Sequence, residues 1–427
     1  MLQKISSKLA LLAIFAMSVF LYACEGGKIE PVPAVEKRTA LVYIVAQNTL
    51  NRFVPLDLDE MKEGFAAIPN PDDYNLLAYV DDYDAPRLLK FEKENNQVVV
   101  DTVITYPDQN SLSLSVMSGV MKEIFSAYEA ESYGLVLWSH ANGWLPGSEQ
   151  PKTGASLRSF GDDSGFYMDL LDLKTALRSC PKFEFILFDA CNMQSVEMAY
   201  ELREATKFFI GSPGEIPAYG APYELVVPAM FSQSNPASEI AQQYFDYYDK
   251  IYDYAKSTRG GAGSRAVYYP YGVAVSVVET QHLGELAMAT KSVIGQHVKD
   301  KIATTDFVSY DDHHYNYYYD LGELVRSITG GDNSYAAWKT AYDKAVVKFL
   351  ATDYILSIYK NPYGVMVPMR NATGLGTFIP ISKNMNFLEG SYWQNQSPSY
   401  IETKTASLES YYTKFGWYAD GGWASVN

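Results

Sequence analysis

Apolar residues occur along the chain in short, nearly continuous runs that alternate with longer segments of helical periodicity. The runs are rich in β-branched and aromatic residues, as buried strands are; they cover residues 40–46, 75–80, 133–138, 183–188 and 208–212. The longer segments repeat apolar positions at the spacing of an amphipathic helix; they cover residues 112–128, 170–177 and 195–203. This alternation predicts a mainly parallel sheet with helices on both faces.

Further elements extend this core on both sides. Residues 87–91 and 97–103 flank a polar turn and predict a hairpin added to the sheet. The glycine-rich residues 259–263 predict a loop or linker. Beyond it, residues 273–278 and 377–379 predict two more strands in otherwise helical sequence. We therefore expect an α/β core over residues 40–258 and a mostly helical C-terminal part with added strands over residues 259–427.

The N-terminus has the pattern of an export signal. Two lysines precede the apolar run 9–22, which is shorter than the roughly 20 residues that a membrane-spanning helix needs. The run ends at Cys24 in a sequence that resembles a bacterial lipobox. We expect residues 1–23 to be a lipoprotein signal peptide, Cys24 to be lipidated, and residues 24–39 to be a tether at the outer membrane or cell surface. The alternative is a plain secretory signal with an incidental cysteine.

The charge and the cysteine count narrow the function. A net charge of −16 over 427 residues argues against nucleic acid as a partner and is compatible with cationic peptides. With Cys24 used by the anchor, Cys180 and Cys191 remain, which is too few for a disulfide framework. A free cysteine in an exported chain favours a chemical role, although buried inert cysteines are common.

Two residues with catalytic chemistry follow predicted strands. His140 comes two residues after strand 133–138, and Cys191 comes three residues after strand 183–188. Functional crevices lie at the carboxyl ends of parallel strands. If these two strands are neighbours, they run about 4.8 Å apart, and the two side chains can meet over the sheet edge. The start of the following helix should lower the pKa of Cys191. This arrangement predicts a nucleophile and general base; the alternatives are a buried core cysteine and a capping histidine.

The sequence around both residues is similar to a known family. Residues 133–140 resemble the catalytic-histidine block of the clostripain family, and residues 188–197 resemble its catalytic-cysteine block, in the same order. Weaker similarities to the family lie at residues 41–46, 212–223 and 320–322. The resemblance implies the caspase-like α/β/α sandwich shared with gingipains and legumains, and cysteine endopeptidase activity. We expect the activity to require no cofactor, and a requirement for calcium stays open.

Several positions depart from the family pattern. Gln47 replaces the usual Asp, and Ala141 replaces the Gly that follows the histidine. The backbone N–H groups of Ala141 and Cys191 are the candidate oxyanion hole. If residue 141 adopts a left-handed conformation, an alanine there costs strain of order 1 kcal/mol. Asn192 and Gln194 replace Leu and Ala, which would change the pocket beside the nucleophile.

Asp189 is the candidate specificity residue. It precedes Cys191 by two positions, so in an extended strand both side chains face the same way. A carboxylate there would pair with the guanidinium or ammonium group of a substrate Arg or Lys. The resemblance also associates this acid with a basic P1 residue, the residue before the cleaved bond. The alternative is that Asp189 caps the following helix.

The segment between the two catalytic candidates predicts self-processing. Residues 147–164 have no periodic apolar pattern and form a long loop for a compact domain. Lys152 and Arg158 in this loop are the candidate autocleavage sites. Residues 311–314 (Asp-Asp-His-His) carry metal-ligand types, but adjacent histidines in a tyrosine-rich run predict a surface loop, and we expect no metal site.

The function that fits best is a monomeric, secreted, membrane-anchored cysteine endopeptidase. It would cleave polypeptides after Arg or Lys through a thioester acyl-enzyme formed by Cys191 and His140. The alternative is a catalytically weak or inactive surface lipoprotein that binds peptide or glycan.

Overall fold

The computed structural model describes residues 37–146, 159–258, 272–299, 302–304, 307–359, 364–380 and 390–426. Within these ranges, no helix has the length and apolar character required to span a bilayer. The expected signal peptide, the lipidation site Cys24 and the cleavage candidates Lys152 and Arg158 lie outside the described residues.

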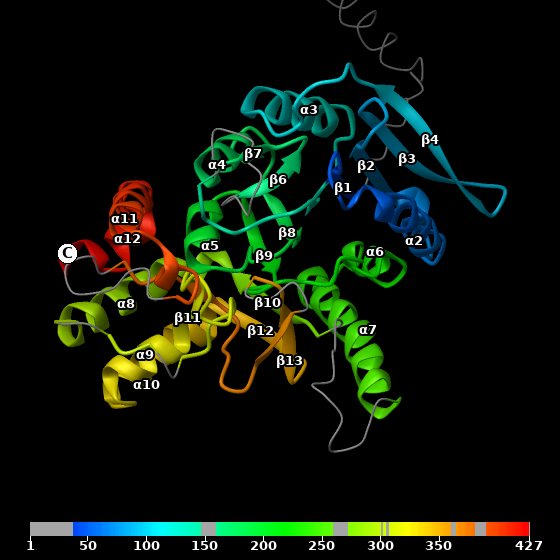
Figure 1. Ribbon diagram of the computed structural model, residues 1–427. Coiled ribbons are helices and arrows are strands. Elements are labelled where there is room, and N and C mark those ends of the chain that lie inside the picture. The colour runs from blue at the N-terminus through cyan, green and yellow to red at the C-terminus, as the bar shows by residue number, and fades with distance from the viewer. Residues whose placement is uncertain are drawn as a thin grey trace, which may run out of the picture. The chain divides into compact units, whose positions relative to one another are not determined.

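A nine-stranded sheet forms the centre of the fold (Figure 1). Its strands, in spatial order, are β12 (Val346–Ala351), β10 (Ala274–Glu279), β9 (Thr206–Gly211), β8 (Phe183–Asp189), β5 (Tyr133–Trp138), β1 (Arg38–Val45), β2 (Tyr74–Asp81), β3 (Arg87–Glu94) and β4 (Gln97–Thr105). The five strands from β9 to β2 are parallel, and the strands on both flanks are antiparallel. The predicted parallel core and its added β3–β4 hairpin are confirmed.

Helices cover both faces of this sheet (Figure 1). One face carries α2 (Val54–Ala66), α6 (Tyr223–Met230) and α7 (Pro236–Thr258). The other carries α3 (Leu114–Ala127), α4 (Leu170–Leu177), α5 (Val196–Leu202), α8 (Leu283–His297), α9 (Leu321–Thr329), α10 (Asn333–Ala345), α11 (Pro398–Tyr412) and α12 (Gly416–Asp420). Short 3-10 turns lie at Asn51–Phe53, Pro71–Asp73, Thr280–His282, Trp393–Asn395 and Trp423–Ser425. This is the expected α/β/α sandwich.

The sequence of β1 shows why the sheet needs cover on both sides. Leu41 and Tyr43 belong to the apolar cluster on one face, whereas Val42 and Ile44 belong to the cluster on the other. Successive side chains of a strand point to opposite faces, so a continuous apolar run buries both. The helices begin where polar side chains satisfy free amides: Ser113 caps α3 and Ser195 caps α5.

The chain beyond residue 259 contributes more strands than expected. β10 and β12 complete the central sheet, so no break in the sheet coincides with residue 258. β13 (Tyr354–Ser357) and β14 (Val365–Pro368) form a hairpin, and β11 (Tyr319–Asp320) pairs with β15 (Gly376–Thr377). The expectation of mostly helical sequence between residues 279 and 376 is therefore wrong in part. β12 lies at the sheet edge, is only partly buried, and follows α10 without a turn residue, which hides its period.

The described end of the predicted loop 147–164, residues 159–164, contains a strand. β6 (Phe160–Asp163) and β7 (Phe166–Met168) form a small hairpin. Its turn contains Ser164 and Gly165, both with positive φ. The hairpin packs against the end of β1, because the Asn48 side chain donates to the Asp162 carbonyl at 2.7 Å.

A buried carboxylate joins α5 to the C-terminal part. One carboxylate oxygen of Glu197 accepts hydrogen bonds from the Phe378 amide and the Tyr412 hydroxyl, both at 2.9 Å. Glu197 is fully buried, and burial raises the pKa of its carboxyl. Because a buried carboxyl without partners is unfavourable, these contacts hold the C-terminal part against the helix that follows Cys191.

Candidate active site

The pairing of β5 with β8 brings the two catalytic candidates to one edge of the sheet. The two strands are parallel and adjacent, and Trp138 is paired with Asp189 at their carboxyl ends. His140 and Cys191 each follow this pair by two residues. Both therefore leave the sheet at the same edge, on neighbouring strands about 4.8 Å apart. The expected adjacency of the two strands is confirmed.

The imidazole of His140 contacts the turn after β1. Thr49 Oγ1 lies 2.8 Å from His140 Nε2, a contact that sequence reasoning missed. The turn is held by the buried Asn48 side chain, which donates to the Val45 carbonyl at 3.1 Å and accepts from the Leu50 amide at 2.9 Å. One indication of this contact could be found in the sequence. The turn after β1 lies beside the turn after β5, because these strands are neighbours in the sheet.

The amide of Ala141 is directed away from the β6–β7 hairpin. Ala141 forms an isolated antiparallel bridge with Phe160, and the Asn142 amide donates to the Ser159 carbonyl at 2.9 Å. In this pattern the bridged residue directs its own N–H away from its partner strand. The partner β6 contacts the turn after β1, so the opposite side is that of β8 and Cys191.

The strain expected at Ala141 does not arise. Ala141 is not one of the described residues with positive φ. Left-handed conformations fall instead at Gly143 (φ 59°) and Asn192 (φ 59°). A Cβ at Gly143 would lie 2.6 Å from the Asn192 carbonyl oxygen, so a glycine is required where the two catalytic loops meet.

The surroundings of the Cys191 thiol favour its protonated form. Its side chain is half-buried, and the Ile216 amide donates to Sγ at 3.5 Å. Burial raises the pKa of Cys191 to about 12, and the nearby Glu215 and Asp189 carboxyls act in the same direction. Glu215 is itself held by the Ile358 amide at 2.7 Å.

The expected lowering of the Cys191 pKa is therefore wrong. α5 begins at Val196, and its N-cap is Ser195, whose side chain accepts from the Met198 amide. The thiol precedes this cap by four residues, whereas the field of a helix end falls off within its first turn. Desolvation and neighbouring carboxyls then dominate.

Asp189 is buried below the loop that precedes α6. Only 3% of the residue is exposed, and its Oδ2 accepts from the Ala221 amide and the Tyr223 hydroxyl, both at 2.9 Å. A Cβ at Gly220 would lie 2.6 Å from Oδ2. Oδ1 is buried and has no hydrogen-bond partner in the described part of the chain. Since Ser195 caps α5, Asp189 does not fill the alternative capping role.

Three more carboxyls lie near Asp189, on α2 and α6. Burial raises the pKa of Asp57 to about 9, with a further contribution from the charge of Asp189. Burial also raises the pKa of Asp189 to about 6. It raises the pKa of Glu60 to about 7, and the neighbouring carboxylate of Glu224 acts in the same direction. Within the described ranges, no lysine or arginine forms an ion pair with these four residues. We call Asp57, Glu60, Asp189 and Glu224 the acid cluster.

The C-terminal part reaches both catalytic loops. The Asn192 side chain donates to the Tyr359 hydroxyl at 2.7 Å, and this hydroxyl bonds the Asn142 side chain. Tyr318 donates to the Asn142 carbonyl at 2.7 Å. Asn192, the residue next to Cys191, is therefore hydrogen-bonded to Tyr359 of the C-terminal part. This contact lies beside the nucleophile, where we expected the departure from the family pattern to change the pocket.

The other two departures lie away from the thiol. Gln194 donates towards the Ser276 carbonyl in β10, at 3.2 Å, so the expected change of the pocket does not come from this residue. Gln47 donates to Asp81 at 2.8 Å and accepts from Ser164 at 2.9 Å. It joins the end of β2 to the β6–β7 turn.

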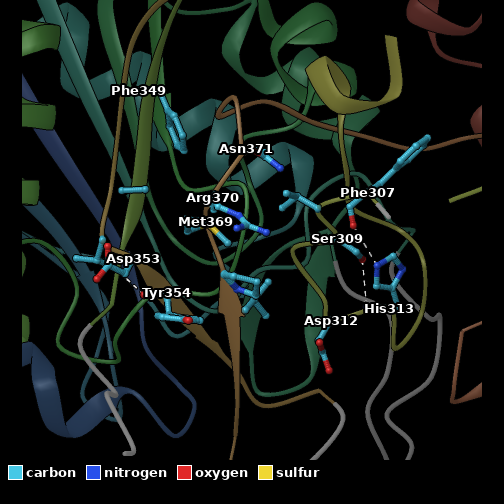
Figure 2. A pocket seen from close by; sticks show the side chains of 15 residues that line it. Phe307, Ser309, Asp312, His313, Phe349, Asp353, Tyr354, Met369, Arg370 and Asn371 are labelled. Atoms are coloured by element: carbon cyan, nitrogen blue, oxygen red, sulfur yellow. Dashed lines mark hydrogen bonds between the residues drawn. The ribbon is translucent and has the colours of Figure 1, made fainter. Parts of the chain in front are cut away.

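A cavity of about 980 Å³ lies elsewhere, between residues 307–313 and the strands β12 to β14 (Figure 2). No catalytic candidate lines it. Asp311, expected in a surface loop, is fully buried and accepts from the Ser309 hydroxyl at 2.5 Å. His313 Nε2 contacts the Phe307 carbonyl at 3.1 Å. In the part of the chain described, no cluster of three metal-ligand side chains is present.

A cysteine and a histidine at the carboxyl ends of adjacent parallel strands, in this sandwich, define the class of the protein: a caspase-like cysteine peptidase. The sequence model of the clostripain family matches residues 42–426, and the chain belongs to this family.

Known relatives agree with this assignment. A secreted C11 cysteine protease from Bacteroides thetaiotaomicron, solved with an irreversible peptide inhibitor, is 38% identical with a TM-score of 0.75, over 91% of this chain and 99% of that one. An inactive zymogen C11 protease from Parabacteroides distasonis is 28% identical with a TM-score of 0.72, over 91% and 99%. Clostripain from Hathewaya histolytica is 26% identical over 196 residues, 39% of this chain and 36% of its own length. The chain thus matches about a third of that curated relative.

The acid cluster makes a prediction about stability and pH. The folded-state pKa of Asp57, about 9, lies above its ordinary value of 3.8, so folding favours the protonated form. Its contribution to stability is complete below pH 4 and is lost as the pH rises towards 9. Asp57→Asn should therefore stabilise the protein at pH 8 by a few kcal/mol and change little at pH 4. Urea unfolding at both pH values measures this; an equal effect at pH 4 and pH 8 would show that Asp57 is ionised in the folded protein.

Proposed function

We propose that the chain is an exported, lipid-anchored endopeptidase that cleaves polypeptides after Arg or Lys with Cys191 and His140. The observation that carries this proposal is the in-register pairing of β5 and β8, which sets both residues two positions beyond the same strand pair. The similar solved structures are C11 cysteine proteases, one of them an inactive zymogen. The identity of the two catalytic residues, the P1 preference and the anchor are the proposal.

The chemistry follows from the two side chains. His140 accepts the thiol proton as Sγ of Cys191 attacks the carbonyl carbon of the P1 residue. The oxyanion receives hydrogen bonds from the amides of Ala141 and Cys191. The imidazolium then protonates the leaving amine, and a water molecule hydrolyses the thioester with His140 again as base. Because burial raises the pKa of the thiol, the proton transfer to His140 belongs to the step in which Sγ attacks.

The acid cluster supports a basic P1 side chain. Asp189 lies on the strand that leads to the nucleophile, and its buried Oδ1 has no partner within the described residues. Within the described residues no lysine or arginine pairs with the acid cluster, so those of its carboxyls that ionise place negative charge beside the end of β8. A substrate guanidinium or ammonium would supply the missing charge and form charge-assisted hydrogen bonds.

One observation favours the alternative of a binding protein without catalysis, namely the raised pKa of Cys191. The same property fits a resting enzyme, and an inactive zymogen is among the similar solved structures. Retention of both His140 and Cys191 at matched strand ends favours the enzyme.

The dyad predicts the effect of two substitutions. Cys191→Ala and His140→Ala should each abolish hydrolysis of Arg-terminated chromogenic peptides, because attack requires both the thiol and its base. Both residues lie beyond their strands, so thermal stability should stay within about 2 kcal/mol of the parent. Activity assays and thermal unfolding measure the two effects. Undiminished turnover by the purified Cys191→Ala variant would contradict the mechanism.

The specificity role of Asp189 makes a separate prediction. Asp189→Asn keeps the shape and removes the charge, so kcat/KM for Arg and Lys peptides should fall by about a hundredfold or more. The Ala221 and Tyr223 contacts of Oδ2 can be kept by the Asn carbonyl, which protects the fold. Steady-state kinetics on Arg, Lys and Asp peptides measure the change. If the variant cleaves Arg peptides as well as the parent, the P1 pocket lies elsewhere.

Self-processing after Lys152 or Arg158 remains a prediction, because these residues match the proposed P1 preference. The residues on both sides of this segment are held together, because β5 before it and β8 after it pair in one sheet, so a cut chain should stay associated. Intact mass of the active protein, beside that of Cys191→Ala, measures it. One uncut chain in both, from an active preparation, would show that no cut is needed.

A further inference from the structure

The two loops that carry the catalytic candidates approach each other closely. Asn142 lies two residues after His140, and Asn192 follows Cys191 directly. A Cβ at Gly143 would lie 2.6 Å from the Asn192 carbonyl oxygen, so the backbones of the two loops are in contact. Asn192 has a φ of 59°, a left-handed conformation that asparagine adopts more readily than most residues. The separation of the dyad therefore depends on what holds these loops together.

The hydroxyl of Tyr359 joins the side chains of both loops. It accepts a hydrogen bond from Nδ2 of Asn192 at 2.7 Å and donates one to Oδ1 of Asn142. The direct contact between the two asparagines is longer, at 3.5 Å. Asn192 is fully buried, so bulk water cannot replace the hydroxyl as a partner of its amide group. One hydroxyl thus satisfies a donor on one loop and an acceptor on the other.

The backbone before Tyr359 is held at a third loop of the site. The amide of Ile358 donates to Oε2 of Glu215 at 2.7 Å. The next residue of that loop, Ile216, donates its amide to Sγ of Cys191 at 3.5 Å. Residues 358 and 359 therefore contact the loops after β5, β8 and β9, which are consecutive strands in the sheet.

The ring of Tyr359 is supported by the tyrosine-rich run. It packs edge-on against Tyr315, with 5.4 Å between the ring centroids. The buried Asp311 carboxyl accepts from the Tyr315 amide at 3.2 Å, and Tyr318, in the same run, donates to the Asn142 carbonyl at 2.7 Å. A side chain packed in this way is preorganised, so its hydroxyl sets the position of the loops instead of following them.

We propose that Tyr359 is a positioning residue of the dyad: its hydroxyl fixes the distance and orientation between the loop of His140 and the loop of Cys191. This inference rests on the proposed function of both residues. Proton transfer from Sγ to the imidazole requires the two groups within hydrogen-bond reach, and a displacement of about 1 Å can lower a rate on the order of a hundredfold. The hydroxyl bonds to residues beside the dyad and acts on the rate through them.

The test compares two substitutions that each remove one tyrosine hydroxyl and keep the ring. Tyr359→Phe leaves both asparagine side chains without their shared partner, so kcat on an Arg peptide should fall about tenfold, with KM within about twofold. Tyr342→Phe is the matched control, because its hydroxyl bonds Thr373 within the C-terminal part, at 2.8 and 2.9 Å. Its kcat should stay within about twofold of the parent.

Three kinetic results would overturn the role of Tyr359. They are a parent-like kcat in Tyr359→Phe, a change confined to KM, and an equal loss of kcat in Tyr342→Phe. The first two would show that the hydroxyl does not act on the chemical step. The third would show that the loss of any hydroxyl bond in the C-terminal part has the same effect.

A second measurement separates this inference from the function on which it rests. Alkylation of Cys191 by iodoacetamide should be slower in Tyr359→Phe and in His140→Ala than in the parent, and Tyr359→Phe should have no further effect in the His140→Ala background. A fall that persists without His140 would show that the hydroxyl acts on the thiol alone, and would overturn the positioning role while the dyad stands. A parent-like alkylation rate and turnover in His140→Ala would refute the dyad itself, and the inference with it.

Discussion

The parallel pairing of β5 with β8 sets the geometry on which the site depends. A slip of one residue in this register would turn every side chain of one strand to the opposite face and separate the two catalytic candidates. The register is held because β8 contributes Phe185 and Leu187 to one apolar cluster and Ile186 and Phe188 to the other. Burial of the strand on both faces thus fixes the position of a thiol that lies beyond its end.

Burial also governs the electrostatics of the site. It raises the pKa of the Cys191 thiol and of the Asp57 and Asp189 carboxyls, since each is removed from water and forms no ion pair with a lysine or arginine of the described ranges. A basic substrate side chain would change this balance by bringing a positive charge next to Asp189. In this account, the positive charge of a substrate Arg or Lys stabilises the ionised form of the buried Asp189 carboxyl.

The sequence predicted the elements that carry long apolar periods. β5 and α4 have the predicted limits, and the parallel direction of the core strands follows from their alternation with helices, whereas their order in the sheet was not predicted. The placement of His140 and Cys191 at neighbouring strand ends was predictable because turns after parallel strands converge. Contacts between distant segments were not: Thr49 and Tyr359 reach the site from 91 and 167 residues away, and no local pattern marks them. The prediction of a lowered pKa for Cys191 was wrong. It used the helix dipole, which can be inferred from local sequence, whereas the burial that raises the pKa depends on tertiary packing.

The central claim is that Cys191 is the nucleophile of a site that recognises a basic residue, and covalent labelling tests it most directly. The chain is treated with a peptidyl acyloxymethyl ketone that ends in Arg, digested, and analysed by mass spectrometry. We expect one adduct per molecule on Cys191, formed in proportion to the loss of activity, and none on Cys180, whose pKa burial raises to about 11. Complete inhibition with Cys191 unmodified, or with the adduct on Cys180, would contradict the account.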